Sequence, residues 1–294
     1  MSEEADPPRP FRWSLARREQ LGGLTALGRR PRPPYPEFHN DLREASARLL
    51  AFSGGADLAF VGRSLESVHD YLSGAFSDLE GAPKVRLLPF SLRFIGADGV
   101  EGLPLHSRAG FFAMLEADGL RPAAIASGPA PLALCDFVAR GGTFESLIRV
   151  LRAHAERDGV DWSAVARRLK ILGLCGRTKN SPNTWRWRQR QDWLHLIPET
   201  PIKNVSAQQR FTFEIANIQP KLTDPHHPGR WAAGAGRPSL TQERLDALRF
   251  AVDLFDRGRK EREALAKLMA TPRYMRLAET RRLISVLRGH APAR

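Results

Sequence analysis

The residues with the clearest chemical potential lie between Pro131 and Thr143, which read PLALCDFVARGGT. A short apolar run meets an acid here, Asp136, and a glycine turn and an amphipathic stretch from Phe144 to His154 follow. This order predicts a strand, a loop and a helix, an arrangement that directs backbone N–H groups toward an anion. Phosphate is the anion we expect at this turn.

A second candidate loop, Gly62-Arg63-Ser64, follows the apolar run from Asp57 to Val61 and precedes another amphipathic stretch. Gly62 would let the backbone approach a ligand, and Arg63 can pair with an oxyanion. Ser64 is expected to cap the following helix. A plain turn with a cap would explain the same three residues, so the prediction depends on this loop lying near the first one.

Short apolar runs and amphipathic stretches alternate from about residue 38 onward. We expect strands at 57–61, 84–90, 132–135 and 171–175, and helices at 42–50, 65–76, 108–118, 144–158 and 162–169. Asn40 is expected to cap the first helix, and Gly54-Gly55 to end it. The alternation predicts an α/β fold, a mostly parallel sheet flanked by helices, which binds ligands at the carboxyl ends of its strands.

The chain divides into four expected parts. Residues 1–37, rich in Pro and Arg, predict an extended or partly disordered arm with a short helix near 15–20, and 38–200 form the α/β domain. Residues 201–235 are expected to be a linker or loop region, and 236–294 a basic helical C-terminal extension. In that last part Thr241 is expected to cap a long amphipathic helix, and two more helices follow at 262–269 and 277–287.

The net charge of +13 is unevenly distributed along the chain. Residues 51–176 hold 13 Lys and Arg against 14 Asp and Glu, whereas residues 177–294 hold 23 against 11. Such a basic C-terminal part predicts a polyanionic partner, either nucleic acid or several phosphate groups. Arginines that merely solvate helix faces are the alternative.

Composition excludes several classes of protein. No apolar run approaches the ~20 residues that span a bilayer, and the N-terminus lacks a basic-then-apolar leader, so we expect a cytoplasmic protein with no membrane partner. The two cysteines, Cys135 and Cys175, lie in apolar runs without metal-ligand spacing, so neither a disulfide framework nor a zinc site is predicted.

Half of the chain's six tryptophans follow the strand expected at 171–175, interleaved with four arginines. Because this passage starts at the carboxyl end of a strand, we expect its loop, Arg177 to Asn183, to close over the site. Trp185 is a candidate for stacking on a substrate base, since aromatic rings among arginines suit bases and phosphates. The alternative is that the tryptophans pack inward while the arginines face water.

The run Leu132 to Thr143 resembles the diphosphosugar motif of the type I phosphoribosyltransferases, in which four apolar residues precede two acids, a short turn and Gly-Gly-Thr. Asp136 takes the position of the second acid, and Cys135 replaces the first. The phosphate loop corresponds to Ala139, Arg140, Gly141, Gly142 and Thr143, with Arg140 where a small residue is usual. Gly62-Arg63-Ser64 falls where the family places its pyrophosphate loop, and 93–108 roughly where it places a mobile loop.

The resemblance implies a phosphorylated sugar or nucleotide as ligand, specifically a phosphoribosyl diphosphate. Transfer of the phosphoribosyl group would release pyrophosphate, with Asp136 orienting the ribose and Arg63 holding the leaving diphosphate. Mg²⁺ would arrive with the ligand and bridge its oxygens, so no metal ligands of the protein itself are expected. The alternative is a non-catalytic phosphoribosyl-fold protein that binds nucleic acid through its basic C-terminal part. Cys135, a poorer acceptor for ribose hydroxyls than a carboxylate, leaves the choice between the two open.

Overall fold

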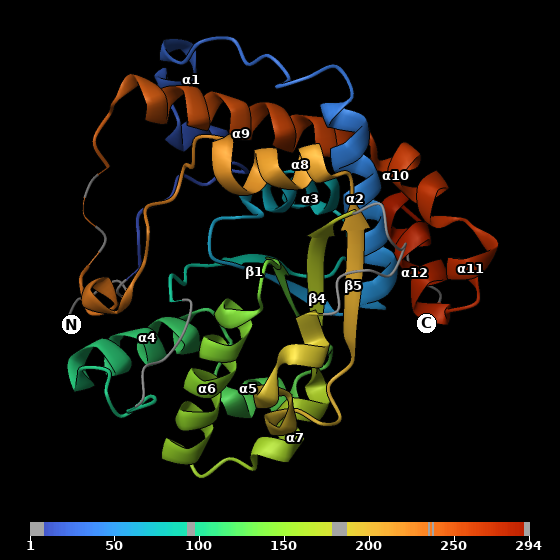
Figure 1. Cartoon of the computed structure of the whole chain (residues 1–294). Coiled ribbons are helices and arrows are strands. Elements are labelled where there is room, and N and C mark those ends of the chain that lie inside the picture. The colour runs from blue at the N-terminus through green and yellow to red at the C-terminus, as the bar shows by residue number, and fades with distance from the viewer. Residues whose placement is uncertain (1–8, 93–97, 178–186, 235, 237, 291–294) are drawn as a thin grey trace.

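A computed structural model describes residues 9–92, 98–177, 187–234, 236 and 238–290. Its centre is a five-stranded sheet with the order β2-β1-β3-β4-β5, and every neighbouring pair is parallel. The strands are β1 (Asp57–Val61), β2 (Val85–Leu88), β3 (Leu132–Phe137), β4 (Leu169–Gly176) and β5 (Ile202–Ala207). The predicted α/β class with a parallel sheet is therefore confirmed (Figure 1).

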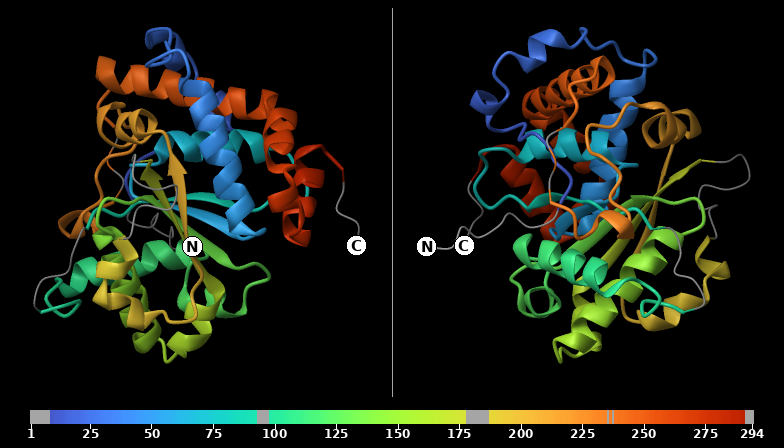
Figure 2. Two further views of the ribbon diagram at one scale, coloured as in Figure 1. Left: turned by 45° about the vertical axis from the view of Figure 1, so that its right-hand side comes forward. Right: turned by 90° about the vertical axis from the view of Figure 1, so that its left-hand side faces the viewer.

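Helices cover both faces of the sheet (Figures 1 and 2). One layer holds α2 (Phe38–Ser53), α3 (Glu66–Phe76), α9 (Gln242–Lys260), α10 (Arg262–Met269) and α12 (Ala278–Leu287), with the short α11 (Pro272–Met275) before α12. The other holds α4 (Leu105–Ala117), α5 (Pro122–Ser127), α6 (Gly142–Arg157) and α7 (Trp162–Arg168). Because side chains alternate along a strand, Ala133 and Cys135 enter the core under the first layer, whereas Leu132 and Leu134 enter the second.

The segment 201–235, predicted to be a linker or loop region, contains secondary structure. It forms the edge strand β5, the short helix α8 (Gln209–Phe213), a π-helical turn η4 (Glu214–Ile218) and a 3₁₀ turn η5 (Pro228–Arg230). In β5 only Val205 and Ala207 are buried, and three of its six residues, Lys203, Asn204 and Ser206, are polar. An edge strand needs few apolar side chains, and this is why the hydropathy pattern did not show it. Two 3₁₀ turns, η2 (Trp187–Arg190) and η3 (Asp192–Leu196), precede it.

Two of the three expected helix caps differ in the structure. The residue before α2 is Glu37, so Asn40 lies inside the helix instead of capping it, although Gly54, with φ +56°, does end it. The residue before α3 is Leu65, and Ser64 makes no cap. The third expectation is confirmed, because the Thr241 hydroxyl accepts a hydrogen bond from Arg244 N at 3.3 Å at the start of α9.

The described part of the N-terminal arm is packed against the C-terminal extension. Its short helices are η1 (Arg18–Gln20) and α1 (Leu24–Leu27), close to the expected helix near 15–20. Trp13, Leu15 and Leu21 are buried in one cluster with Leu248 and Phe255 of α9. Figure 2 shows the arm, in blue, curving around α9, in orange. Apolar side chains between the prolines and arginines therefore fix this segment.

None of the helices in the described part of the chain is both long enough and apolar enough to cross a membrane.

Candidate functional site

The chain reverses its direction of winding between β1 and β3. The connection after β1 leads through α3 to the β2 edge, and the connection after β3 leads through α6, on the opposite face, toward β4. In open α/β sheets, ligands bind at such a switch point, outside the carboxyl ends of the two strands. The two loops singled out in the sequence, Gly62-Arg63-Ser64 and Ala139 to Thr143, follow these two strands.

A cavity of about 460 Å³, which we call the loop cavity, lies at this switch point. Its walls are Ser64, Asp136, Phe137, Val138, Ala139, Arg140, Gly141, Gly142, Thr143, Phe144, Ala216 and Asn217. Ser64, Asp136 and the whole predicted phosphate loop are thus brought together around one space. Its volume lies in the range of small-molecule sites.

The loop Ala139 to Thr143, predicted to bind phosphate, leads into the amino end of α6, a helix of 16 residues. Gly141 precedes the helix, and no side chain of the described residues caps its first N–H groups. Free N–H groups and the helix dipole give this end partial positive charge, which favours an anion. The exposed side chain of Arg140 adds a full positive charge beside the same cavity.

Gly141 meets two constraints that only glycine satisfies. Its φ of +83° lies in the left-handed region, and a Cβ built on it would be 2.8 Å from Cε3 of Trp187. The Trp187 ring is buried, and its Nε1 donates a hydrogen bond to Oδ1 of Asn204 on β5 at 2.9 Å. Trp187, one of the three tryptophans that follow β4, therefore packs inward and lies against the loop Ala139 to Thr143.

Asp136 lies near the end of β3 with its side chain almost fully buried, at 4% exposure. One carboxylate oxygen accepts a hydrogen bond from Phe137 N at 2.7 Å. Asp136 also lines the loop cavity, beside Ala139 to Thr143.

Cys135 is placed away from the loop cavity. Its side chain is completely buried in the core under α2 and α3, and its thiol lies 3.7 Å from the carbonyl of Ala133. Burial, and then the negative charge of Asp136, raise the pKa of this thiol well above its ordinary value. Neighbouring residues on a strand point to opposite faces, and Cys135, unlike Asp136, does not line the loop cavity.

The loop after β1 contributes less to the loop cavity than expected. Gly62 has φ +68°, and a Cβ there would lie 2.9 Å from the carbonyl oxygen of Phe90, so glycine is required for the turn. Arg63 donates a hydrogen bond to the carbonyl of Thr223 at 3.4 Å. Of the three residues only Ser64 lines the loop cavity.

Of the predicted lid and stacking residues Arg177, Asn183 and Trp185, the structure describes only Arg177. Arg177 is exposed at the end of β4, and its N–H donates to the carbonyl of Ala207 at 2.7 Å. It does not line the loop cavity. Asn183 and Trp185 lie outside the described residues, and their proposed lid and stacking roles stay predictions.

Another wall of the loop cavity, formed by Ala216 and Asn217 of η4, was not predicted from the sequence. The amide of Asn217 donates a hydrogen bond to the carbonyl of Phe213 at 3.2 Å. Near it, the partly buried ammonium of Lys221 donates to the carbonyl of Ile215, and desolvation lowers the pKa of Lys221 to about 8. No local motif marks these residues, because they reach the site only through the path of the chain after β5.

The segment that follows η4 is connected to α3 by a buried network of hydrogen bonds. The Glu66 carboxylate accepts hydrogen bonds from Leu222 N and Thr223 N, each at 3.0 Å. Arg12 of the arm donates to both Glu66 and Asp70. Burial opposes ionisation of Asp70, but the charge of Arg12 and contact with His69 hold its pKa below the ordinary value. Hydrogen bonds and ion pairs to the acids of α3 thus connect the arm, α3 and the segment after η4.

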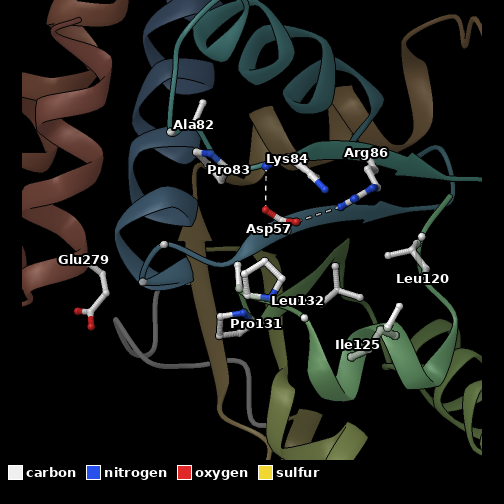
Figure 3. A pocket seen from close by; sticks show the side chains of 18 of the residues that line it. Asp57, Ala82, Pro83, Lys84, Arg86, Leu120, Ile125, Pro131, Leu132 and Glu279 are labelled. Atoms are coloured by element: carbon white, nitrogen blue, oxygen red, sulfur yellow. Dashed lines mark hydrogen bonds and ion pairs between the residues drawn. The ribbon is translucent and has the colours of Figure 1, made fainter. Parts of the chain in front are cut away.

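Two other features of the described structure lie outside the loop cavity. A cavity of about 740 Å³ lies near the amino ends of β1, β2 and β3, where Asp57 accepts hydrogen bonds from Lys84 N and Arg86 (Figure 3). None of the predicted site residues lines this cavity, and it lies at the end of the sheet opposite to the switch point.

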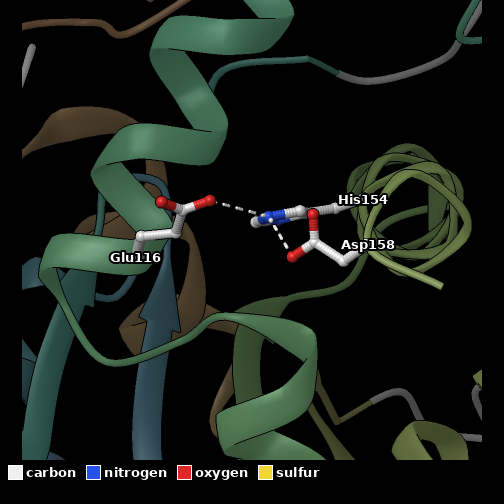
Figure 4. Close-up of side chains that lie close together, drawn as sticks. All are labelled: Glu116, His154 and Asp158. Atoms are coloured by element: carbon white, nitrogen blue, oxygen red, sulfur yellow. Dashed lines mark hydrogen bonds and ion pairs between the residues drawn. The ribbon is translucent and has the colours of Figure 1, made fainter. Parts of the chain in front are cut away.

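The second feature is a cluster of Glu116, His154 and Asp158, whose ligand atoms lie within 4.8 Å of one another (Figure 4). Arg157 donates to Glu116 at 2.7 Å and to Asp158 at 2.8 Å, and Arg121 donates to Asp158 at 2.7 Å. These guanidinium groups already balance the carboxylates, so the cluster is explained as a network of ion pairs.

Several arginines of the basic C-terminal part also have structural partners. Arg244 pairs with Asp224, Arg288 with Glu263 and Arg259 with Asp78, while Arg262 donates to the carbonyls of Ala75 and Ser77. Part of the excess positive charge therefore holds the extension on the rest of the fold. Nucleic-acid binding stays a prediction.

Comparison with protein-family models, with curated proteins and with solved structures finds no match to this chain.

Proposed function

We propose that this protein binds a phosphorylated sugar or nucleotide, such as phosphoribosyl diphosphate, in the loop cavity. The observation that carries this proposal is the convergence of the open amino end of α6 and the Asp136 carboxylate on one cavity. The amino end of α6, with Arg140 and Thr143, suits a phosphate group, and a carboxylate suits the hydroxyl groups of a sugar. No other described cavity combines these two kinds of group at a switch point.

Transfer of the phosphoribosyl group is the reaction that we propose for this site. Displacement at the anomeric carbon develops positive charge on the sugar, which a carboxylate such as Asp136 would stabilise while the loop holds the phosphate. With Cys135 in the core, Asp136 is the only one of the two motif positions that lines the cavity. The departing diphosphate requires neighbouring donors, and Ser64 is the residue of the β1 loop that offers one there.

The donor set of the loop cavity fits Mg²⁺ that is carried by the ligand. Mg²⁺ in proteins is commonly held by one or two carboxylates together with substrate phosphates and water. Asp136 supplies one carboxylate, and Ser64 and Thr143 supply hydroxyl groups. When bound, the ion would neutralise charge on the diphosphate.

Ligand binding to matched variants tests the proposal. We expect phosphoribosyl diphosphate with Mg²⁺ to raise the melting temperature of the wild-type protein, because a ligand that binds only the folded state stabilises it. Asp136→Asn and Gly142→Val should each abolish binding measured by calorimetry, whereas Asp57→Asn, at the far end of the sheet, should retain it. Unchanged binding in both site variants would contradict the proposal.

The basic C-terminal part supports a second candidate function, that of a non-catalytic protein that binds nucleic acid. Residues 177–294 carry 12 of the 13 net positive charges. Filter binding of DNA and RNA across a salt series tests it, because phosphate contacts weaken steeply as salt rises. Absence of binding at low salt would rule this function out.

A further inference from the structure

A second cavity, which we call the arm cavity, lies between the N-terminal arm, α9 and η4. Its volume is about 690 Å³, and its apolar walls include Pro34, Ile218 and Phe250. Ile218 is 58% exposed and Phe250 is only partly buried, so large apolar side chains here are open to a ligand. This volume lies in the range of small-molecule sites.

Positive charge surrounds this apolar space. Arg29, Arg30 and Arg32 of the arm all line the arm cavity. Arg29 is paired with Asp246, which its backbone N–H and Nε contact at 2.8 Å and 2.7 Å. Arg30 and Arg32 are exposed and have no hydrogen-bond or ion-pair partner among the described residues. Two guanidinium groups are therefore left for a ligand.

The remaining acid of the arm cavity does not cancel this charge. Glu214 also lines the cavity, but it supplies one carboxylate against the two unpaired guanidinium groups of Arg30 and Arg32. The local balance therefore favours an anion, and the guanidinium fork matches carboxylate or phosphate geometry.

We propose that the arm cavity binds a small organic anion with an apolar body, such as an aromatic carboxylate. The ring lies against Ile218 and Phe250, and the charged group meets Arg30 and Arg32. This site is separate from the loop cavity, because η4 forms the wall between them: Glu214 and Ile218 face the arm cavity, and Ala216 and Asn217 face the loop cavity. The proposal therefore does not depend on the function proposed for the loop cavity.

Three probes separate the contributions of the ring and of the charge. Calorimetry is carried out on the full chain with 1-naphthoate, with 1-naphthylmethanol, which has a similar ring but no charge, and with acetate, which has the charge but no ring. We expect 1-naphthoate to bind at least about tenfold more tightly than 1-naphthylmethanol, and acetate not to bind. Equal affinity for the first two, or no binding of 1-naphthoate, overturns the proposal.

Variants locate the binding. Arg30→Gln combined with Arg32→Gln should remove the preference for 1-naphthoate over 1-naphthylmethanol. Ile218→Trp should fill the arm cavity and abolish binding, whereas Leu277→Trp, at another exposed apolar position, should not change it. Gly142→Val should leave 1-naphthoate binding intact, since it changes only the loop cavity. Loss of binding in Gly142→Val with retention in Ile218→Trp would place the anion in the loop cavity and overturn the proposal.

Discussion

Gly141 lies directly against the ring of Trp187, so closely that a single added methyl group would overlap the indole at 2.8 Å. Gly141→Ala must also adopt φ +83° with a side chain, which costs about 1 to 2 kcal/mol. We expect the variant to lose about 2 to 4 kcal/mol of unfolding free energy in urea titration, because contact with the ring adds to the strain. Binding of phosphoribosyl diphosphate should weaken as well, since the loop must move.

Gly159→Ala is the matched control for this prediction. Gly159 has φ +64°, and a Cβ built on it meets nothing within 4 Å. It therefore experiences the backbone strain without the contact, and we expect a loss of only about 1 kcal/mol. Equal losses in the two variants would show that Trp187 does not restrict the loop.

The helices α3 and α9 cross at a pair of glycines, Gly74 and Gly258. A Cβ on Gly74 would overlap the carbonyl oxygen of Phe255, and one on Gly258 would overlap that of Tyr71. Alanine normally stabilises a helix by about 1 kcal/mol relative to glycine. Here we expect Gly258→Ala to destabilise the protein by about 3 kcal/mol in urea titration, because backbone cannot move aside as a flexible side chain can. A gain in stability would contradict this close crossing.

Much of the fold could be predicted from the sequence, because β1, β3 and β4 are almost continuous apolar runs. Their ends, and the turn before α6, follow from local residue types. The edge strand β5 could not be predicted, since its polar residues give no clear period. Long-range placement was also beyond the sequence, since Asn217 reaches the loop cavity only through the path of the chain after β5. The burial of Cys135, by contrast, agrees with its place in an apolar run.

Arg12 is expected to stabilise the fold through Glu66 and Asp70. Arg12→Met leaves two buried carboxylates without their cation, and loss of one partner of a buried ion pair costs about 3 to 5 kcal/mol. We expect a loss at the lower end of this range at pH 7, because Glu66 keeps its backbone donors. Urea titration measures it, and the exposed Arg17→Met is the control, with little expected change.

The cost of Arg12→Met should depend on pH. The pKa of Asp70 is lowered in the folded protein, so the stability that its charged form provides is present above its ordinary pKa and is lost as pH falls below about 4. In the variant, Asp70 stays buried without the cation of Arg12, and burial favours its protonated carboxyl group. The difference in unfolding free energy between wild type and Arg12→Met should therefore shrink in acid. A constant difference from pH 7 to pH 3 would show that Asp70 is not part of the interaction.

His226 is expected to make the protein sensitive to mild acid. Burial, together with the charge of Arg230, lowers its pKa to about 4, and its Nε2 has no hydrogen-bond partner among the described residues. Unfolded chains protonate histidine near pH 6.5, so between about pH 6.5 and pH 4 the unfolded state binds more protons than the folded state. The free energy of unfolding therefore decreases as the pH is lowered through this range.

His226→Leu should therefore flatten the pH dependence of stability. We expect the wild-type protein to lose about 2 to 3 kcal/mol of unfolding free energy through this residue between pH 7 and pH 4, and the variant to lose correspondingly less. Urea titration at a series of pH values measures the slope. His227→Leu, at the neighbouring exposed position, is the comparison: it should change the slope less than His226→Leu does, because burial of His226 is a larger cause of its lowered pKa than the charge of His227. The same slope in His226→Leu as in wild type would mean that the buried ring takes up its proton without unfolding.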